Sequence, residues 1–133
     1  MLCVLNGGKL IQHVEGHNGS HTMTYNENFK NPLSRNNLRV MTVPSDHHQM
    51  MYPYEMNKNN YSIMGWSSKY KSDTYLNGKN KEINLPNKFF EPEIVYFEQS
   101  NSLCIQYHPE YDSTENSTKN NTGSLIRKLV YKK

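Results

Sequence analysis

The sequence predicts one α/β domain in which short strands precede a C-terminal helix. Two apolar runs, residues 94–97 and 103–107, flank the polar residues 99–102, which is typical of a β-hairpin. A helix is predicted near the end of the chain by an apolar stripe at helical spacing: Leu125, Ile126, Leu129 and Val130. Strands covered by a packing helix indicate the α/β class. At 133 residues the chain is long enough for one core but short for a complete doubly wound enzyme.

The N-terminal residues 1–5 are apolar without a break, and Gly7 and Gly8 follow as a helix stop. An isolated helix needs about 12 to 15 residues, and no Ser, Thr, Asp or Asn precedes this run as a cap. We therefore expect the run to be the end of a helix that begins upstream. Residues 9–14 are expected to form a short extended segment.

Three histidines follow at a spacing of four residues: His13, His17 and His21. On a helix this spacing would align them on one face as metal ligands, but two glycines in the span make a helix unfavourable. The preferred interpretation is a loop over residues 15–21 with incidental histidines, and no metal site is predicted. A metal site and a substrate-pocket role for His17 or His21 are the alternatives.

The middle of the chain contains three further predicted strands, at residues 22–25, 38–43 and 61–68. Residues 50–54 are expected to form a short helical or extended cover. The long polar run 71–87 is expected to be a variable surface insertion.

The segment after the hairpin is polar, and residues 111–123 are expected to form a loop. Thr122 or Ser124 can cap the last helix, because a side-chain hydroxyl there accepts from a free backbone N–H. This helix is expected to cover one face of the sheet.

Composition and charge exclude several classes of protein. The net charge of +3 comes without the concentrated basic stripe of a nucleic-acid-binding protein. No stretch reaches the roughly 18 apolar residues of a membrane-spanning helix. Two cysteines without a CxxC motif favour free thiols in a reducing compartment, so a cytoplasmic protein is expected. No motif implies a cofactor.

The hairpin leads directly into His108, Pro109 and Glu110. Because strand side chains alternate, His108 and Glu110 are predicted to be neighbours on one face of the strand. Pro109 fixes its own φ and favours an extended residue before it. A carboxylate beside a histidine orients the ring and stabilises the imidazolium, as in a nucleophilic triad. His108 and Glu110 are therefore the candidate catalytic residues.

A second group of polar residues follows the predicted strand 38–43: Ser45, His47, His48 and Gln49. Open α/β sheets bind their ligands at the carboxyl ends of strands, so these residues are candidates for substrate binding. A polar loop that only satisfies its own backbone is the alternative.

Three blocks of the sequence together resemble the class I glutamine amidotransferases: residues 5–12 (LNGGKLIQ), 43–49 (VPSDHHQ) and 103–110 (LCIQYHPE). Their order is similar to that of the branch that hydrolyses γ-glutamyl amides, such as γ-glutamyl-γ-aminobutyrate hydrolases. The resemblance spans nearly the whole chain. It implies that residues 1–133 are the C-terminal part of a flavodoxin-like domain with a mixed sheet.

The resemblance also implies a role for each candidate residue. His108 would be the general base and then the acid, Glu110 would orient it, and the substrate would be a small γ-glutamyl amide. Ser45 and its neighbours His47, His48 and Gln49 would lie near the γ-glutamyl pocket. No nucleic acid or membrane partner is implied.

The family's nucleophilic cysteine lies in a strand-to-helix elbow, which the resemblance puts just before residue 1. Cys3 matches a later helix position and Cys104 lies in the strand that leads to His108, so neither is expected to be the nucleophile. The chain is therefore expected to be inactive alone. It could instead be one subunit of a split enzyme, with a separate chain carrying the N-terminal half, or a non-catalytic binding or structural module.

Overall fold

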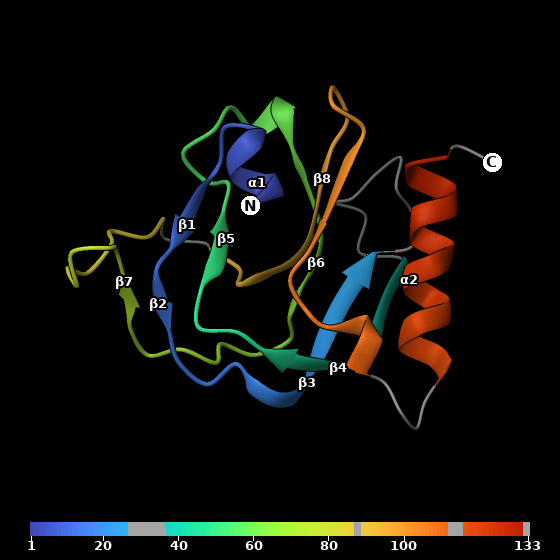
Figure 1. Ribbon diagram of the computed structural model, residues 1–133, viewed down its shortest axis with the longest axis horizontal. Helices are drawn as coiled ribbons and strands as arrows, with labels where there is room; N and C mark the ends of the chain where they lie inside the picture. The colour runs from blue at the N-terminus through green and yellow to red at the C-terminus, as the bar shows by residue number, and fades with distance from the viewer. Residues whose placement is uncertain (27–36, 87–88, 112–115, 132–133) are drawn as a thin grey trace.

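The computed structural model describes residues 1–26, 37–86, 89–111 and 116–131 of the chain (Figure 1). Its elements, in chain order, are α1 (Leu2–Leu5), β1 (Lys9–Ile11), β2 (His13–Val14), β3 (Asn18–Asn26), β4 (Leu38–Asp46), β5 (Met50–Tyr52), η2 (Lys58–Asn60), β6 (Ser62–Ser67), β7 (Tyr75–Leu76), β8 (Pro92–Phe97), β9 (Ser102–Ile105), η3 (Pro109–Tyr111) and α2 (Asn116–Leu129). None of the described helices combines the length and apolar character needed to cross a membrane.

The largest sheet has five strands in the order β4-β3-β6-β8-β9, and two pairs, β1-β5 and β2-β7, form small separate sheets. The predicted hairpin is confirmed as β8 and β9, in which Ile94 is opposite Ile105 and Phe97 is opposite Ser102. All of the described strand pairs are antiparallel. A flavodoxin-like domain has a parallel sheet, so the structure confirms α/β content with a C-terminal helix but not the mixed, flavodoxin-like sheet.

Strand β8 lies in the middle of the packing, and all six of its residues are buried. Its side chains alternate between two faces, as the pleat of a strand requires. Ile94 and Tyr96 belong to a core under α2 that also contains Met23 and Met64. Val95 and Phe97 point the other way, into a second core with Cys3, Met51 and Cys104.

The two small sheets carry a third core, which includes Ile11, Met50 and Phe89. Figure 1 shows these sheets on the opposite side of the large sheet from α2. The extended segment predicted at residues 9–14 is confirmed as β1 and β2, and the cover predicted at 50–54 is the strand β5. The N-terminal run forms one helical turn, α1, so its helical conformation is confirmed, while an upstream beginning of this helix stays a prediction.

Helix α2 begins at Asn116, well before the predicted cap at Thr122 or Ser124. The cap and the loop over residues 116–123 are therefore wrong predictions, while residues 112–115 lie outside the described part. The first turns of α2 carry hydroxyls where an apolar stripe would be expected. Thr118 donates to the carbonyl of Thr42 at 3.1 Å, and Thr122 Oγ1 lies 2.8 Å from the hydroxyl of Tyr107. Hydrogen bonds to the sheet replace hydrophobic contacts there, so the apolar pattern does not reveal this half of the helix.

Candidate functional site

His108 and Glu110 form a hydrogen-bonded pair just beyond the end of β9. His108 Nδ1 lies 2.8 Å from Glu110 Oε1, and the imidazole stacks on the ring of Tyr111 at 4.5 Å between ring centroids. Because a carboxylate can only accept, Nδ1 carries the proton, so that in the neutral ring Nε2 has the lone pair. The hydrogen bond from His108 holds the pKa of the Glu110 carboxyl below its usual value.

The contact between the pair was predicted from alternation along a strand, and that reason is wrong. Strand β9 ends at Ile105, and Pro109–Tyr111 form a turn of 3₁₀ helix. This turn, rather than a pleat, brings the carboxylate back to the ring. The His108 side chain is 29% exposed and that of Glu110 is 63% exposed, so the pair lies at the surface.

The three blocks that resemble glutamine amidotransferases are joined by hydrogen bonds. The backbone N–H of His108 donates to the carbonyl of Pro44 at 2.9 Å. Gln106 Nε2 donates to the carbonyl of Gln49 at 3.2 Å, and Gln49 Nε2 donates to Gln12 Oε1 at 2.8 Å. Segments far apart in the sequence thus meet at one end of the large sheet.

The four predicted substrate-binding residues divide into an inward and an outward pair. Ser45 belongs to β4 and is buried, and its hydroxyl has no hydrogen-bond partner among the described residues. His47 also turns inward, with Nδ1 2.8 Å from the carbonyl of Gln49 and Nε2 buried. His48 and Gln49 are exposed. The outward pair is the most open to a dissolved ligand, whereas His47 is half-buried and Ser45 is buried.

Neither cysteine has the surroundings of a nucleophile. Cys3 and Cys104 are both free thiols and both buried. Burial raises the pKa of Cys3, and it raises the pKa of Cys104 to about 12. The prediction that both are packing residues without activated thiols is confirmed on these two observations.

A cavity of about 320 Å³ lies beside the second core, between α1 and the hairpin strand β9. Its walls include Leu2, Leu103 and Ile105, together with the side chains of Gln49 and Gln106. His108 and Glu110 do not line it. The cavity therefore adjoins the outward Gln49 but not the catalytic candidates.

A cluster of histidines and glutamates lies inside the molecule, where the sequence predicted a loop with incidental histidines. His17 precedes β3, and His47 follows β4, directly beyond the last pair of the β3-β4 ladder, Asn18 and Asp46. Their rings are consequently 4.5 Å apart. His21, in β3, has Nε2 2.8 Å from Oε1 of Glu93 in β8. The loop prediction is wrong for residues 18–21, which belong to β3.

The second carboxylate of the cluster, Glu91, is held by three donors. Its oxygens accept the backbone N–H groups of Lys71 and Ser72 at 2.9 and 3.0 Å and the hydroxyl of Tyr75 at 2.8 Å. Burial works to raise the pKa of this carboxyl, but the hydrogen bonds and the nearby His17 outweigh it, and the pKa is lowered. Glu91 is therefore a fixed carboxylate inside the fold.

Several polar atoms of this cluster have no hydrogen-bond partner among the described residues: His17 Nδ1 and Nε2, His21 Nδ1, Ser45 Oγ, His47 Nε2 and Glu93 Oε2. A buried polar atom left unpaired costs about 1 to 3 kcal/mol, so such a concentration calls for an explanation. The sequence carried one signal for it, since two glutamates, Glu91 and Glu93, lie two residues apart at the start of an apolar strand. Their histidine partners, His21 and His17, lie about seventy residues earlier, and the local pattern does not link them.

No protein-family model matches this chain, and none of the curated proteins or solved structures matches it either. The resemblance to glutamine amidotransferases therefore stays a prediction from the three blocks of the sequence.

Proposed function

We propose that this chain supplies the histidine and glutamate of a cysteine-dependent hydrolase that acts on γ-glutamyl amides such as glutamine. The observation that carries the proposal is the hydrogen bond between His108 Nδ1 and Glu110 Oε1. It leaves Nε2 as the basic nitrogen of a partly exposed ring. This is the arrangement by which a base accepts a thiol proton and later returns it to the leaving amine.

In the proposed reaction a cysteine thiolate attacks the γ-carbonyl of the substrate and releases ammonia. His108 takes the thiol proton and protonates the leaving amine, and it then deprotonates the water that hydrolyses the thioester. Glu110 holds the ring in the required tautomer. His48 and Gln49 are exposed next to this region and are proposed to bind the amino acid end of the substrate, with Ser45 and His47 supporting them from inside.

The nucleophile is not one of this chain's two cysteines, because both are buried with raised pKa values. The flavodoxin-like assignment belongs to the same proposal. The junction of the three blocks supports the proposed site, whereas the antiparallel pairing of the described strands does not support that fold. The proposed partner is a separate segment or chain that carries the cysteine elbow.

Substrate binding tests the proposal without requiring turnover. The ¹⁵N-labelled chain is titrated with L-glutamine and, as a control, with D-glutamine, and backbone amide shifts are followed by NMR. We expect saturable amide shifts at residues 45–49 and at His108 and Glu110 with the L-isomer only. Equal responses to the two isomers, or no response at these positions, would overturn the proposal.

The ring of His108 supplies a second readout. In the native chain its ¹⁵N shifts should show a proton on Nδ1, and Glu110→Gln should move the population toward the Nε2–H form because the anionic acceptor is lost. Glu98→Gln, at an exposed glutamate of the hairpin turn, is the matched control and should leave these shifts unchanged. Unchanged ring ¹⁵N shifts of His108 in Glu110→Gln would contradict the assigned role of Glu110.

A further inference from the structure

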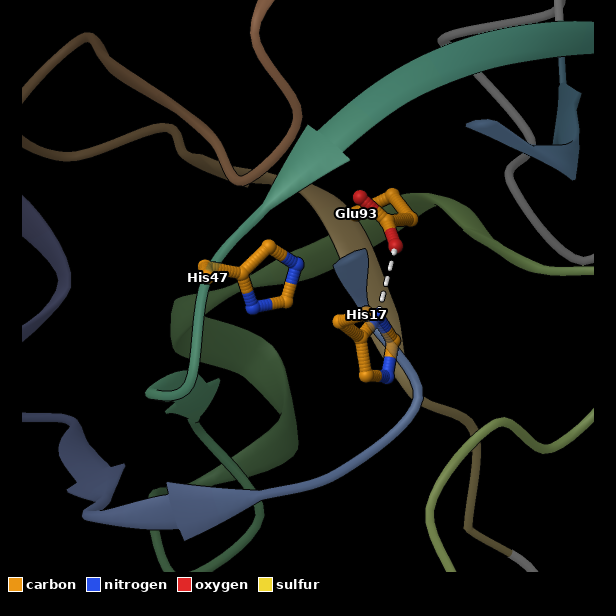
Figure 2. A group of neighbouring side chains, drawn as sticks. All are labelled: His17, His47 and Glu93. Carbon is orange, nitrogen blue, oxygen red and sulfur yellow. Dashed lines mark ion pairs between the residues drawn. The ribbon is translucent and has the colours of Figure 1, made fainter. Parts of the chain in front are cut away.

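The buried cluster described above contains three residues with the donor atoms of a metal site: His17, His47 and Glu93. One ligand atom from each lies within 4.8 Å of the other two (Figure 2). The side chains of His17 and Glu93 are 0% exposed. We propose that these three residues bind a Zn²⁺ ion that joins the start of β3, the end of β4 and strand β8. The catalytic candidates His108 and Glu110 do not belong to this site, which shares only His47 with the proposed substrate-binding residues.

The strongest support comes from the ring nitrogens that face away from the proposed ion. A histidine that binds a metal through one nitrogen almost always donates its other N–H to a carboxylate or a carbonyl. His47 Nδ1 lies 2.8 Å from the carbonyl of Gln49, which can only accept, so Nδ1 is protonated and Nε2 offers a lone pair. His17 Nε2 lies 3.3 Å from Glu91 Oε2, which is ion-pair range without hydrogen-bond geometry, and Nδ1 lies 3.9 Å from Glu93 Oε1.

The carboxylate ligand has the same kind of support. His21 Nε2 holds Glu93 Oε1 at 2.8 Å and thereby fixes the carboxylate, while Oε2 has no hydrogen-bond partner among the described residues. Glu91, which lies beside His17, accepts hydrogen bonds from Lys71, Ser72 and Tyr75. The inner three residues are thus surrounded by groups that orient each of them, as in known metal centres.

The donor set selects the metal. Two imidazoles and one carboxylate suit zinc, which binds His₂Glu sets with one further position for water, whereas Mg²⁺ and Ca²⁺ prefer oxygen ligands. A metal binds the neutral imidazole, and the carbonyl of Gln49, which can only accept, places the proton of His47 on Nδ1 and not on the nitrogen that faces the proposed ion.

The distances fit an ion after a small movement of side chains. Three atoms within 4.8 Å of one another enclose a point no more than about 2.8 Å from each. Zinc binds nitrogen and oxygen at about 2.0 to 2.2 Å, so each ligand has to approach by less than about 1 Å. We expect rotation of the side chains to supply this without a change in the strands.

The competing explanation is a protonated His17 between Glu91 and Glu93, with no metal. The two explanations differ in measurable zinc binding. The full chain is stripped with a chelator, titrated with Zn²⁺ by calorimetry, and examined for its thermal unfolding with and without the ion. We expect one Zn²⁺ per chain and a higher Tm in the zinc-bound form, since a ligand that binds only the folded state stabilises it. Cobalt in place of zinc should give the visible absorption of a four-coordinate nitrogen and oxygen site.

Two variants and one control assign the ion to these residues. Glu93→Gln keeps an oxygen for the hydrogen bond from His21 and removes the charged ligand, and His17→Gln removes an imidazole. Each should weaken zinc binding by at least about 100-fold, more than the loss of an orienting neighbour does. His13→Gln removes an exposed histidine outside the cluster and should bind zinc as the native chain does.

Circular dichroism of the chelator-treated variants shows whether they fold. If His17→Gln does not fold, Glu93→Gln decides the question alone. Absence of zinc binding by the native chain, or native affinity in a folded Glu93→Gln variant, would overturn the proposal. Loss of affinity in His13→Gln would do the same, because it would put the ion at the surface.

Discussion

Glu91 is the residue whose contacts hold the 71–75 segment against the core. Its carboxylate accepts two backbone N–H groups and the Tyr75 hydroxyl, and it is 1% exposed. Hydrogen bonds to a charged acceptor are stronger than neutral ones. A single side chain therefore fixes a segment that the sequence suggested was a variable surface insertion.

Replacing this carboxylate by an amide should be costly. In Glu91→Gln one oxygen becomes an NH₂ group that faces N–H and O–H donors, and we expect the free energy of unfolding to fall by about 1.5 to 3 kcal/mol. Urea unfolding of the variant measures this change. Glu82→Gln, at an exposed glutamate, should stay within about 0.5 kcal/mol of the native chain. Similar values for the two variants would show that Glu91 is not structurally important.

The two thiols should be slow to react in the native chain. Their raised pKa values leave almost no thiolate at neutral pH, and both side chains are buried. With a glutamine-derived electrophile at pH 7 we expect far slower labelling than of a free thiol, and rapid labelling of both cysteines in denaturant. Stoichiometric labelling of the folded chain at the rate of a free thiol is the contrary result.

Single residues were predicted from sequence where chemistry is local. His108 and Glu110 are two positions apart, so their contact could be anticipated even though the turn that makes it was not. His17 and Glu93 are distant in the sequence. The glycines around His17 favoured a loop prediction, although this residue lies directly before strand β3. Burial of a polar cluster depends on tertiary pairing, which a local pattern does not contain.

Among the elements, β6 contains an irregularity that depends on glycine. The register between β6 and β8 shifts at Gly65, which lies opposite Tyr25 on one side and Ile94 on the other. A Cβ atom at Gly65 would lie 3.0 Å from Met23 Sδ and 3.1 Å from two carbons of Ile94. The strand can pack this closely only because the side chain is absent.

Gly65→Ala should therefore destabilise the chain by about 1 to 3 kcal/mol, the range of overpacked cores. Gly78→Ala is the matched control, because a Cβ there would meet only Gln12 Cγ at 3.5 Å, an ordinary contact. Thermal unfolding of the two variants separates them. A Gly65→Ala variant as stable as Gly78→Ala would mean that Met23 and Ile94 move aside freely.

Elements with a clear apolar period were predicted well, and those stabilised by polar contacts were not. The β8-β9 hairpin alternates strongly and lies where the sequence put it, within one or two residues. The first half of α2 is attached through Thr118 and Thr122, and the predicted start was accordingly too late. Strand β4 continues through Pro44 to Asp46, since its partner β3 extends just as far.

At the scale of the whole molecule, Gln106 connects the small sheet β1-β5 with the large one. Its Oε1 accepts the backbone N–H of Met51 at 3.0 Å, and its Nε2 donates to the carbonyl of Gln49 at 3.2 Å. One side chain thus makes the two hydrogen bonds that a neighbouring strand would otherwise make. The arrangement of the sheets depended on this long-range pairing and could not be read from local periodicity.

Gln106→Ala should loosen the attachment of β5. The Met51 N–H loses its acceptor in a buried environment, and we expect a destabilisation of about 1 to 3 kcal/mol. Amide hydrogen exchange should accelerate mainly in residues 49–52 and less in β3. Gln99→Ala, in the exposed hairpin turn, is the control and should leave exchange unchanged. Uniform acceleration across the large sheet would show that the two sheets do not open separately.

The distribution of methionines makes the three cores distinguishable by sulfur oxidation. Met23 and Met64 lie under α2, Met51 lies in the core on the other face, and Met50 lies between the small sheets. Peroxide converts an exposed thioether to a sulfoxide, so Met1, which is 86% exposed, should react first. A buried methionine is oxidised only when its own part of the fold opens. The sulfoxide that forms is too polar to pack in the core again. Oxidative damage is thus expected to accumulate in the least stable core and, once begun, to prevent that core from closing again.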